Sequence, residues 1–189
     1  MFEIISKTRF YDFKAYYKLY QLGLNYPFVA DIYVYFARYG IVFFFLSFAY
    51  LIWVKRINAF ICSFIAMGLA GFADILIFLY WKRPRPFVTY ANIINPQVEG
   101  MRIDSSSFPS SHTYIVFAIA TSVFLYGHKR LGTALFVLAI FVAVGRVGAG
   151  LHYPSDVIGG AGIGIASGII SYILVRRWQK NWIGIANSQ

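Results

Sequence analysis

Long apolar runs, separated by short polar segments, occupy most of the chain after residue 31. A helix needs about 20 apolar residues to cross the hydrocarbon core of a bilayer, and most of these runs reach that length. The pattern predicts an all-α membrane bundle, a single domain over residues 1–189 with five transmembrane helices. The expected spans cover residues 32–54, 57–81, 111–126, 131–149 and 157–175.

The first 30 residues follow a different pattern, in which Tyr and Phe are mixed with Lys and Arg and no stretch is apolar enough to span. Such a segment is typical of a helix that lies in the membrane interface, with aromatic rings buried and charges in water. We therefore expect an interfacial helix and a turn over residues 1–30, followed by a transmembrane catalytic core over residues 31–178.

Composition supports the membrane assignment. Hydrophobic residues make up 59% of the chain and charged residues 13%, a balance far outside that of soluble domains. The formal net charge of +10 raises the question of nucleic acid, but the basic residues flank apolar runs and form no soluble patch. Anionic lipid surfaces and membrane topology explain them better. We expect the lipid bilayer and no nucleic acid as a partner, and the sequence leaves the oligomeric state open.

Three polar clusters interrupt the apolar pattern at residues 82–87 (KRPRPF), 108–113 (FPSSHT) and 145–156 (GRVGAGLHYPSD). Because consecutive spans run in opposite directions, all three clusters should lie on the same face of the membrane. The turns and tail of the other face carry cations and no acids: Lys55, Arg56, Lys129, Arg130, Arg176, Arg177 and Lys180. The positive-inside rule makes that face cytoplasmic and the clusters extracytoplasmic. The basic N-terminal helix, which would lie on the cluster face, argues against this orientation.

The clusters contain the elements of a phosphate site. Arg85 and Arg146 offer planar, permanently charged groups that suit phosphate oxygens. We expect Pro109 to be the first helical residue of the third span, which would leave the backbone N–H groups of Ser110, Ser111 and His112 unpaired at a helix end. The Ser110 hydroxyl can add a further donor.

Two histidines complete the set. Phosphoryl transfer requires a nucleophile, a proton donor to the leaving group and positive groups around the equatorial oxygens. Asp156 lies four residues after His152, so its carboxylate can hold one ring nitrogen while the other attacks phosphorus. His112 can protonate the departing oxygen. We expect no metal and no cofactor, because a di-metal site needs several carboxylates and only Asp156 and Asp104 are near.

Two charges fall inside expected spans. Arg38 and Asp74 are each eighteen residues from Arg56 in the turn between the first two spans, and are therefore level in a hairpin. Charges at such depth are usually paired, so a structural Arg38–Asp74 ion pair is expected; a role of Asp74 in positioning Arg85 is the alternative. In the fifth span, Gly160, Gly164 and Gly168 repeat every four residues, which predicts a close helix-packing seam.

The ordered motifs Arg-Pro at 85–86, Pro-Ser-x-His at 109–112 and Arg-x5-His-x3-Asp at 146–156 resemble the type 2 phosphatidic-acid phosphatase superfamily of membrane lipid phosphatases. The resemblance covers residues 30–176. It implies that His152 is the nucleophile, forms a phosphohistidine and is oriented by Asp156. It further implies that His112 is the general acid.

Carried over position by position, the same resemblance assigns phosphate binding to Arg85, Ser110 and Arg146, with Ser111 beside them. This chain departs from the family pattern at three places. The Lys expected seven residues before Arg85 is Phe78, and Lys82 or Arg83 is the candidate replacement. Ser111 stands where the family has Gly, and Gly145 where it has Ser.

Within the superfamily, the short chain and the Arg-Pro-Phe segment look most similar to bacterial undecaprenyl-pyrophosphate phosphatases. That implies hydrolysis of undecaprenyl pyrophosphate to undecaprenyl phosphate at the outer surface of the bacterial cytoplasmic membrane. The alternatives are a lipid A 1-phosphatase, a phosphatidylglycerophosphate or phosphatidate phosphatase, a phosphotransferase to another acceptor, and a lipid-phosphate carrier that does not hydrolyse its ligand.

Overall fold

The computed structural model describes residues 2–97 and 106–186, with side chains described for residues 10–97 and 106–181. Over these residues the chain forms helices and no strand, which confirms the all-α prediction. In chain order they are α1 (Phe2–Asn25), α2 (Pro27–Trp53), α3 (Ile57–Tyr80), α4 (Pro86–Thr89), α5 (Ser111–Leu125), α6 (Lys129–Gly148) and α7 (Pro154–Ala186).

Four helices are long and apolar enough to cross a membrane, over Pro27–Trp53, Ile57–Tyr80, Lys129–Gly148 and Pro154–Asn181. The fifth expected span, α5, is shorter at 15 residues. It lies in the middle of the bundle against α3, α6 and α7, and none of its side chains is exposed. Protein therefore surrounds α5 where lipid surrounds the outer helices, so the length required to match a bilayer does not apply to it.

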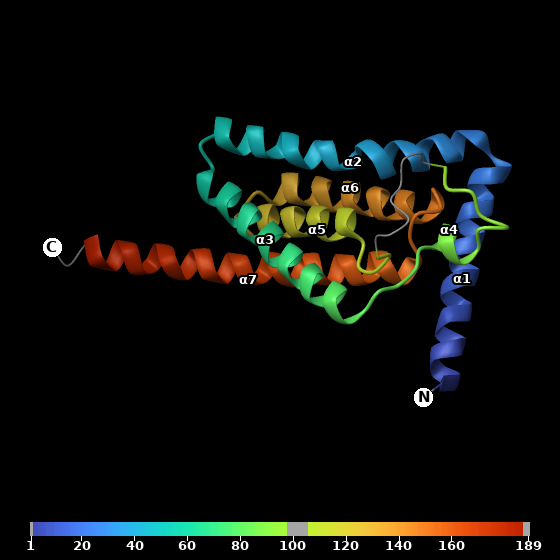
Figure 1. Ribbon diagram of the computed structural model, residues 1–189. Coiled ribbons are helices and arrows are strands. Elements are labelled where there is room, and N and C mark those ends of the chain that lie inside the picture. The colour runs from blue at the N-terminus through green and yellow to red at the C-terminus, as the bar shows by residue number, and fades with distance from the viewer. Residues whose placement is uncertain (1, 98–105, 187–189) are drawn as a thin grey trace.

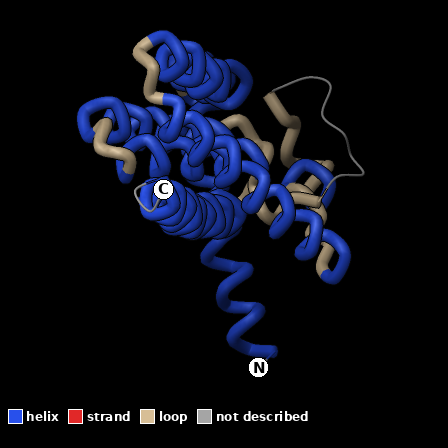
Figure 2. The backbone as a smooth tube through the Cα atoms, turned by 90° about the vertical axis from the view of Figure 1, so that its left-hand side faces the viewer, coloured by secondary structure: helices blue, strands red, loops and turns tan. Residues whose placement is uncertain are grey.

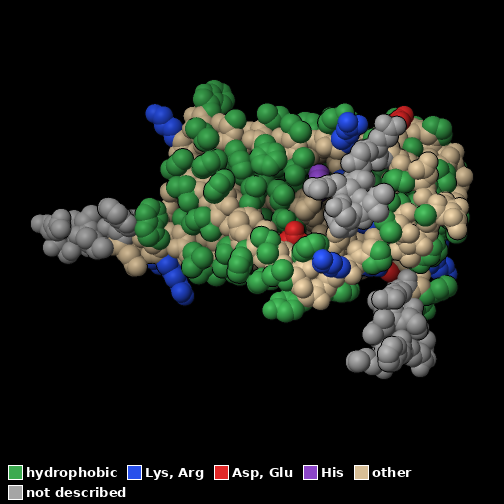
Figure 3. Space-filling model, in the orientation of Figure 1, with side chains coloured by type: hydrophobic (Ala, Val, Ile, Leu, Met, Phe, Trp, Pro, Cys, Tyr) green, Lys and Arg blue, Asp and Glu red, His purple; other side chains and the backbone are tan. Residues whose placement is uncertain are grey.

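The outer helices present their apolar side chains to the surroundings. Phe64, Phe72 and Leu79 of α3 are each at least 60% exposed, and Ile158 of α7 is 71% exposed. Figure 3 shows many apolar side chains along the middle of the bundle on the visible face, with lysines and arginines mostly toward its ends. Such a surface is expected where the surrounding solvent is hydrocarbon, and the chain is a multi-pass membrane protein.

Helix α1 runs across one end of the bundle, roughly perpendicular to the long helices (Figure 1), and its N-terminal part extends away from them (Figure 2). Its aromatic face is packed inward. Tyr16 is fully buried beside the ring of Tyr153, and the Tyr20 hydroxyl donates to the carbonyl of Asn95 at 2.9 Å. The helix expected at the interface is thus also a packed part of the end that carries the polar clusters.

The predicted glycine seam joins α7 to α5. A Cβ atom on Gly160 would lie 2.9 Å from the Ser110 carbonyl oxygen, and one on Gly168 would lie 2.7 Å from Cβ of Thr121. At Gly164 the added atom would meet the Tyr114 carbonyl oxygen within contact distance. The backbones of α5 and α7 approach this closely because no side chain stands between them.

Helix α7 is longer than its expected span. It begins at Pro154 and continues to Ala186, through the basic residues 176–180 that the sequence pattern placed in a tail after the span. The cations of the opposite membrane face do lie at the other end of the bundle, where Lys55, Arg56 and His128 line a common cavity. His128 is the N-cap of α6, at the opposite end of that helix from Arg146.

Candidate active site

The three polar clusters meet at the α1 end of the bundle. Arg85 directly precedes α4, Arg146 lies in the last turn of α6, and His152 lies in the connection between α6 and α7. His112 is the second residue of α5, within electrostatic reach of Arg85, Arg146 and His152. The alternation of spans had predicted this convergence.

His152 is held in one tautomer. Its Nδ1 lies 2.8 Å from the backbone carbonyl oxygen of Ser107. A carbonyl can only accept a hydrogen bond, so Nδ1 carries the proton and Nε2 keeps its lone pair. The side chain is 1% exposed, and burial, together with the nearby Arg146 and Arg85 charges, lowers the pKa of His152 to about 4, against the opposing effect of Asp156.

Two guanidinium groups face that lone pair. Nη1 of Arg85 lies 3.2 Å from His152 Nε2, and Nη2 of Arg146 lies 3.3 Å from the same atom. Arg85 is anchored by donating to the Leu151 carbonyl at 3.2 Å, and Arg146 by donating to the Ala37 carbonyl of α2 at 3.1 Å. An unprotonated nucleophilic nitrogen between two buried cations is an arrangement suited to a phosphoryl group.

Gly145, where the family has Ser, sits against α2. A Cβ atom at Gly145 would lie 2.9 Å from the carbonyl oxygen of Tyr33 and 3.1 Å from the Ala37 nitrogen. The close approach of α6 to α2 is what brings the Ala37 carbonyl within reach of Arg146. The departure from the family pattern therefore has a packing reason.

Asp156 is fully buried and holds several groups at once. Its Oδ2 accepts from the Ser107 hydroxyl at 2.5 Å and from the Tyr153 backbone N–H at 2.8 Å. The same oxygen lies 3.6 Å from His152 Nδ1, too far for a hydrogen bond. The sequence placed the carboxylate directly on the ring nitrogen. Here Asp156 reaches the ring through Ser107, whose hydroxyl donates to the carboxylate and whose carbonyl accepts a hydrogen bond from the ring Nδ1–H.

The α5 helix begins later than predicted. Its first residue is Ser111 with Ser110 as the N-cap, so the expectation that Pro109 is its first helical residue is wrong. The Ser110 N–H is occupied, because it donates to the Asp156 carbonyl at 3.2 Å. The first three N–H groups of the helix, from Ser111 onward, have no intrahelical partner and are available to an anion.

The side chains at this helix end lie beside the nucleophile. The Ser110 hydroxyl is buried and accepts from Thr113 Oγ1 at 3.0 Å. Nδ1 of His112 is buried without a hydrogen-bond partner. A buried imidazole nitrogen in a polar site with no partner is a position from which a substrate oxygen can be contacted.

Lys82 and Phe78 lie together at the end of α3 and just beyond it. Lys82 Nζ is 4.7 Å from the centre of the Phe78 ring, a cation–π distance. The candidate replacement cation therefore lies beside the residue that occupies the family's Lys position in the sequence.

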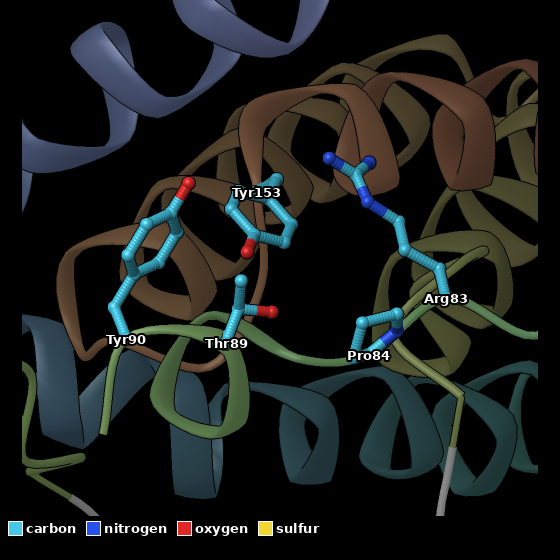
Figure 4. A pocket seen from close by; sticks show the side chains of 5 residues that line it. All are labelled: Arg83, Pro84, Thr89, Tyr90 and Tyr153. Carbon is cyan, nitrogen blue, oxygen red and sulfur yellow. The ribbon is translucent and has the colours of Figure 1, made fainter.

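Arg83, the other candidate cation, is already engaged. Its guanidinium makes ion pairs with Asp12 at 2.6 Å and Asp156 at 2.7 Å, and its Cζ lies 4.0 Å from the centre of the Tyr153 ring. Figure 4 shows it beside that ring, at the edge of a cavity of about 150 Å³. Of the two candidates, Lys82 is the one whose charge is not neutralised by an acid within the described residues.

The expected Arg38–Asp74 ion pair is absent from the described part of the chain. Arg38 is exposed and lies 5.6 Å from the centre of the Tyr39 ring, whereas Asp74 accepts from the Tyr114 hydroxyl at 3.1 Å. Helices α2 and α3 diverge from their shared turn (Figure 1), so residues that are level along a hairpin are not adjacent here. This prediction was wrong because it assumed parallel packing of the two helices.

A second cavity, of about 240 Å³, leads from the side of α3 toward the site. It is lined by Asp74, Ile75, Phe78, Arg85, Ser106, Pro109 and Ser111. The alternative reading of Asp74, near the Arg85 region, is consistent with this position. Its α3 wall consists of Ile75 and Phe78 together with Asp74, and its other wall carries Arg85 and two serines beside Pro109.

Two residues of this site, Ser107 and Asp12, were not identified from the sequence. Asp12 is an acid within an aromatic and basic segment, and that setting was the available signal. Ser107 contributes its hydroxyl to Asp156 and its carbonyl to His152, and no sequence pattern marks a carbonyl. Asp104 lies outside the described residues. Over the described ranges, no three His, Cys, Asp or Glu side chains gather as metal ligands would.

The bundle and this site define a membrane lipid phosphatase, an enzyme that hydrolyses a phosphoric ester or anhydride of a lipid. The chain belongs to the PAP2 superfamily, whose family model matches residues 59–180. This confirms the resemblance seen in the motifs.

Two curated relatives are bacterial. The bacitracin transport permease protein BcrC of Bacillus licheniformis is 34% identical over 145 residues, which are 77% of this chain and 68% of that protein. The undecaprenyl-diphosphatase BcrC of Bacillus subtilis is 31% identical over 107 residues, 56% of this chain and 52% of that protein.

Solved structures agree on the fold. LpxE of Aquifex aeolicus superposes with a TM-score of 0.59 and 26% identity, over 82% of this chain and 92% of that one. A PAP2-type phosphatidylglycerolphosphate phosphatase from Bacillus subtilis gives a TM-score of 0.61 at 19% identity, over 89% of this chain and 86% of that one.

Proposed function

We propose that this protein is a metal-independent phosphatase that removes the terminal phosphate of a lipid pyrophosphate, with undecaprenyl pyrophosphate as the preferred substrate, through a phosphohistidine on His152. The observation that carries the proposal is the position of His152 Nε2, unprotonated and within 3.3 Å of guanidinium nitrogens from both Arg85 and Arg146. A phosphoryl group drawn in between those cations would meet the lone pair.

In the first step Nε2 of His152 attacks the terminal phosphorus, and the bond from phosphorus to the bridging oxygen breaks. Arg85, Arg146 and the free N–H groups at the start of α5 stabilise the charge on the three equatorial oxygens. His112 donates a proton to the bridging oxygen, so the lipid monophosphate leaves and the phosphoryl group remains on His152.

In the second step a water molecule attacks the phosphohistidine. His112, now unprotonated, takes the proton of that water, and the P–N bond breaks to release inorganic phosphate. The hydrogen bond from Nδ1 to the Ser107 carbonyl persists through both steps and keeps the ring from rotating. Asp156 stabilises the ring through Ser107.

The lipid is proposed to reach this site sideways, through the cavity along α3. Ile75, Phe78 and Leu79 are exposed on the outer surface of that helix, and the cavity that begins there ends at Arg85 and Ser111. An isoprenoid tail can remain in the bilayer while its head enters between α3 and the segment 106–109. Binding by this route does not require the long apolar tail to leave the hydrocarbon core of the bilayer.

A pyrophosphate carries a second phosphate, and Lys82 is the proposed cation for it. Lys82 lies over Phe78, which lines the cavity, so its ammonium group stands near the path between the bilayer and Arg85. The name of the Bacillus subtilis relative, an undecaprenyl-diphosphatase, supports a pyrophosphate substrate. The fold also supports the alternatives, since its solved neighbours are LpxE and a phosphatidylglycerolphosphate phosphatase.

The active site is proposed to face the extracytoplasmic side of the bacterial cytoplasmic membrane. The turns at the other end carry Lys55, Arg56, Lys129 and Arg130, which favour the cytoplasm. A lipid pyrophosphate presented at the outer leaflet would then be dephosphorylated where it is presented.

The test is phosphate release by purified protein in detergent with EDTA, across undecaprenyl pyrophosphate, lipid A, phosphatidylglycerophosphate and phosphatidate. We expect the highest kcat/KM with undecaprenyl pyrophosphate, inhibition by vanadate as a mimic of five-coordinate phosphorus, and no turnover by H152A. H128A, at the far end of the bundle, is the matched control and should keep full activity. Activity retained in H152A would overturn the nucleophile assignment, and loss of turnover with EDTA would overturn metal independence.

Two further outcomes separate the remaining alternatives. Binding of the lipid without release of phosphate would identify a carrier. Transfer of label from the substrate to an added acceptor alcohol, in preference to water, would identify a phosphotransferase.

A further inference from the structure

We propose that Asp12, on the crosswise helix α1, is a positioning residue of the catalytic site that acts through Arg83 on Asp156. The inference rests on the proposed function only in calling the site catalytic. Under this proposal α1 helps to position catalytic groups, in addition to packing across the end of the bundle.

The geometry is a chain of alternating charges. Asp12 Oδ2 lies 2.6 Å from Arg83 Nη2, and Arg83 Nη1 lies 2.7 Å from Asp156 Oδ1. The side chains are 8%, 17% and 0% exposed in that order. Water therefore does little to screen these interactions, and each charge constrains the next.

Asp12 also holds the helix that carries Asp156. Its Oδ1 accepts the Ser155 backbone N–H at 2.9 Å, and its Oδ2 accepts the Ser155 hydroxyl at 2.6 Å. Ser155 is in the first turn of α7, so a carboxylate from α1 binds the free N–H end of that helix and interacts favourably with its dipole. Asp12 thus fixes the start of α7 and the guanidinium beside it together.

Arg83 completes the set of donors around Asp156. Oδ2 is held by Ser107 and by the Tyr153 N–H, whereas Oδ1 receives Nη1 of Arg83. The guanidinium carbon lies 4.0 Å from the centre of the Tyr153 ring, a cation–π distance. If Asp12 were neutral, Arg83 would lose the acid that fixes its other nitrogen, and the orientation of Asp156 would loosen.

Stability alone is a poor explanation for such a chain. Buried ion pairs contribute little net stability, because desolvation offsets the attraction between the charges. This one ends at the carboxylate that, through Ser107, controls the ring of His152. Asp12 and Arg83 should therefore affect the pKa of the His152 ring as well as its position.

Substitutions of Asp12 and of Arg83 should shift the pKa of His152 in opposite directions. Arg85 before α4, Arg146 on α6, His112 on α5 and Asp156 on α7 face the ring; Asp12 and Arg83 lie behind Asp156. Replacing Asp12 by Asn removes a negative charge and should lower the pKa of His152 further. Replacing Arg83 by Gln removes a positive charge and should raise it.

Ring titration measures this without any turnover. The chain has three histidines, so ¹⁵N-histidine spectra in micelles can be assigned with H112A and H128A. We expect the His152 midpoint to move down by about 0.3–1 pH unit in D12N and up by a similar amount in R83Q, and the double variant to lie near wild type. D31N, which removes an exposed carboxylate from α2, is the control and should not move it. Unchanged midpoints, or shifts of the same sign in both variants, would overturn the proposal.

Kinetics give the second readout. We expect kcat to fall about 10- to 100-fold in D12N with KM within about twofold, as for a misplaced nucleophile, and D12E to recover part of the loss. If wild type and D31N release no phosphate, the proposed function fails while the ring titration still decides the role of Asp12. If kcat is normal in a folded D12N, the positioning role fails while the proposed function stands.

The cavity beside Arg83 allows a test by chemical rescue. It has a volume of about 150 Å³ and is lined by Arg83, Pro84, Thr89, Tyr90 and Tyr153 (Figure 4). In R83A, guanidinium at low millimolar concentration should enter this space and raise kcat at least severalfold. Urea, which has the same shape and no charge, should not. Equal effects of both, or of neither, would count against an electrostatic role of Arg83.

Discussion

Ser107 binds the two partners of the catalytic pair with two different atoms. Its hydroxyl donates to Asp156 at 2.5 Å, and its carbonyl accepts a hydrogen bond from Nδ1–H of His152 at 2.8 Å. A serine thus stands where a direct contact between carboxylate and imidazole was expected.

This relationship predicts the effect of S107A. The variant keeps the carbonyl and loses the hydroxyl, so the ring stays in its tautomer while Asp156 loses a buried donor. We expect kcat to fall about 10-fold, because a lost hydrogen bond to a charged group costs about 1.5 kcal/mol. Phosphate release measures it, with D156N as the comparison, which should lose more because the side chain loses its charge and an NH2 donor replaces one of the two accepting oxygens. If S107A were as impaired as H152A, the Ser107 hydroxyl would have a larger role than linking Asp156 to the His152 ring.

The unprotonated His152 ring predicts how the rate falls at low pH. Burial and two arginines lower the pKa of His152 to about 4, so the free enzyme keeps its nucleophile until the pH falls through that value, and kcat/KM should decline below about pH 4. A bound phosphate brings negative charge to Nε2 and favours the protonated ring, so the limb in kcat should lie at higher pH. Initial rates across pH 3–8 at constant ionic strength test both. A kcat/KM limb near pH 6.5 would contradict the buried, cation-flanked geometry.

The same shift has a consequence for stability. The pKa of His152 is lower in the folded protein than in the unfolded chain, so the unfolded state binds protons more readily. The contribution of this group to stability is therefore full above about pH 6.5, the ordinary histidine value, and is lost progressively as the pH falls below it. Thermal unfolding of H152Q and wild type between pH 4 and 8 should show a smaller loss in the variant.

The Asp74–Tyr114 contact predicts a thermodynamic cycle. Y114F and D74A should couple by about 0.5–1.5 kcal/mol in the free energy of unfolding, since they share one hydrogen bond. R38Q and D74A should be additive within about 0.5 kcal/mol, because their side chains do not meet. Unfolding in micelles measures both cycles. Strong coupling between R38Q and D74A would instead be evidence that Arg38 and Asp74 do form an ion pair.

The glycine seam predicts a contrast within one helix. G164A places a Cβ against the Tyr114 carbonyl and should destabilise the protein by about 1–3 kcal/mol through overpacking. G162A, two residues away, adds a Cβ with nothing within 4 Å and should be neutral or slightly stabilising, since alanine favours helix more than glycine does. Unfolding midpoints of the two variants make the comparison. Equal effects would mean that α7 and α5 do not approach closely at Gly164.

Membrane orientation can be tested with the native cysteine left in place, because Cys62 is fully buried. Ile93 at the site end is 60% exposed, and Arg130 is exposed at the other end. An impermeant maleimide should label I93C in intact cells and R130C only after permeabilisation. The reverse pattern would place the site in the cytoplasm.

The sequence predicted what depends on period and spacing. Apolar run lengths gave the helices of the bundle, and alternation of the spans gave the common end of the polar clusters. The motif order identified the family before any geometry was available. Each of these rests on residues close together in the chain or on a count of membrane crossings.

The errors and omissions concern contacts between distant segments. The Arg38–Asp74 pair required α2 and α3 to pack side by side, and their divergence depends on what packs between them. Asp12 meets Ser155 across a sequence separation of 143 residues, and Ser107 acts through a carbonyl that every residue possesses. The α5 helix starts at Ser111 and not at Pro109 because the Ser110 backbone is extended, with φ −73° and ψ 112°, which no local signal reveals.

The enclosure of α5 has a consequence for where this enzyme can work. Membranes differ in hydrocarbon thickness by several ångströms, and outer helices respond by tilting or by drawing lipid toward them. Since α5 has no exposed side chain, its depth follows its protein neighbours, and the close glycine contacts with α7 hold it against that helix. Changes in bilayer thickness should therefore alter how substrate arrives more than how the phosphoryl group is transferred.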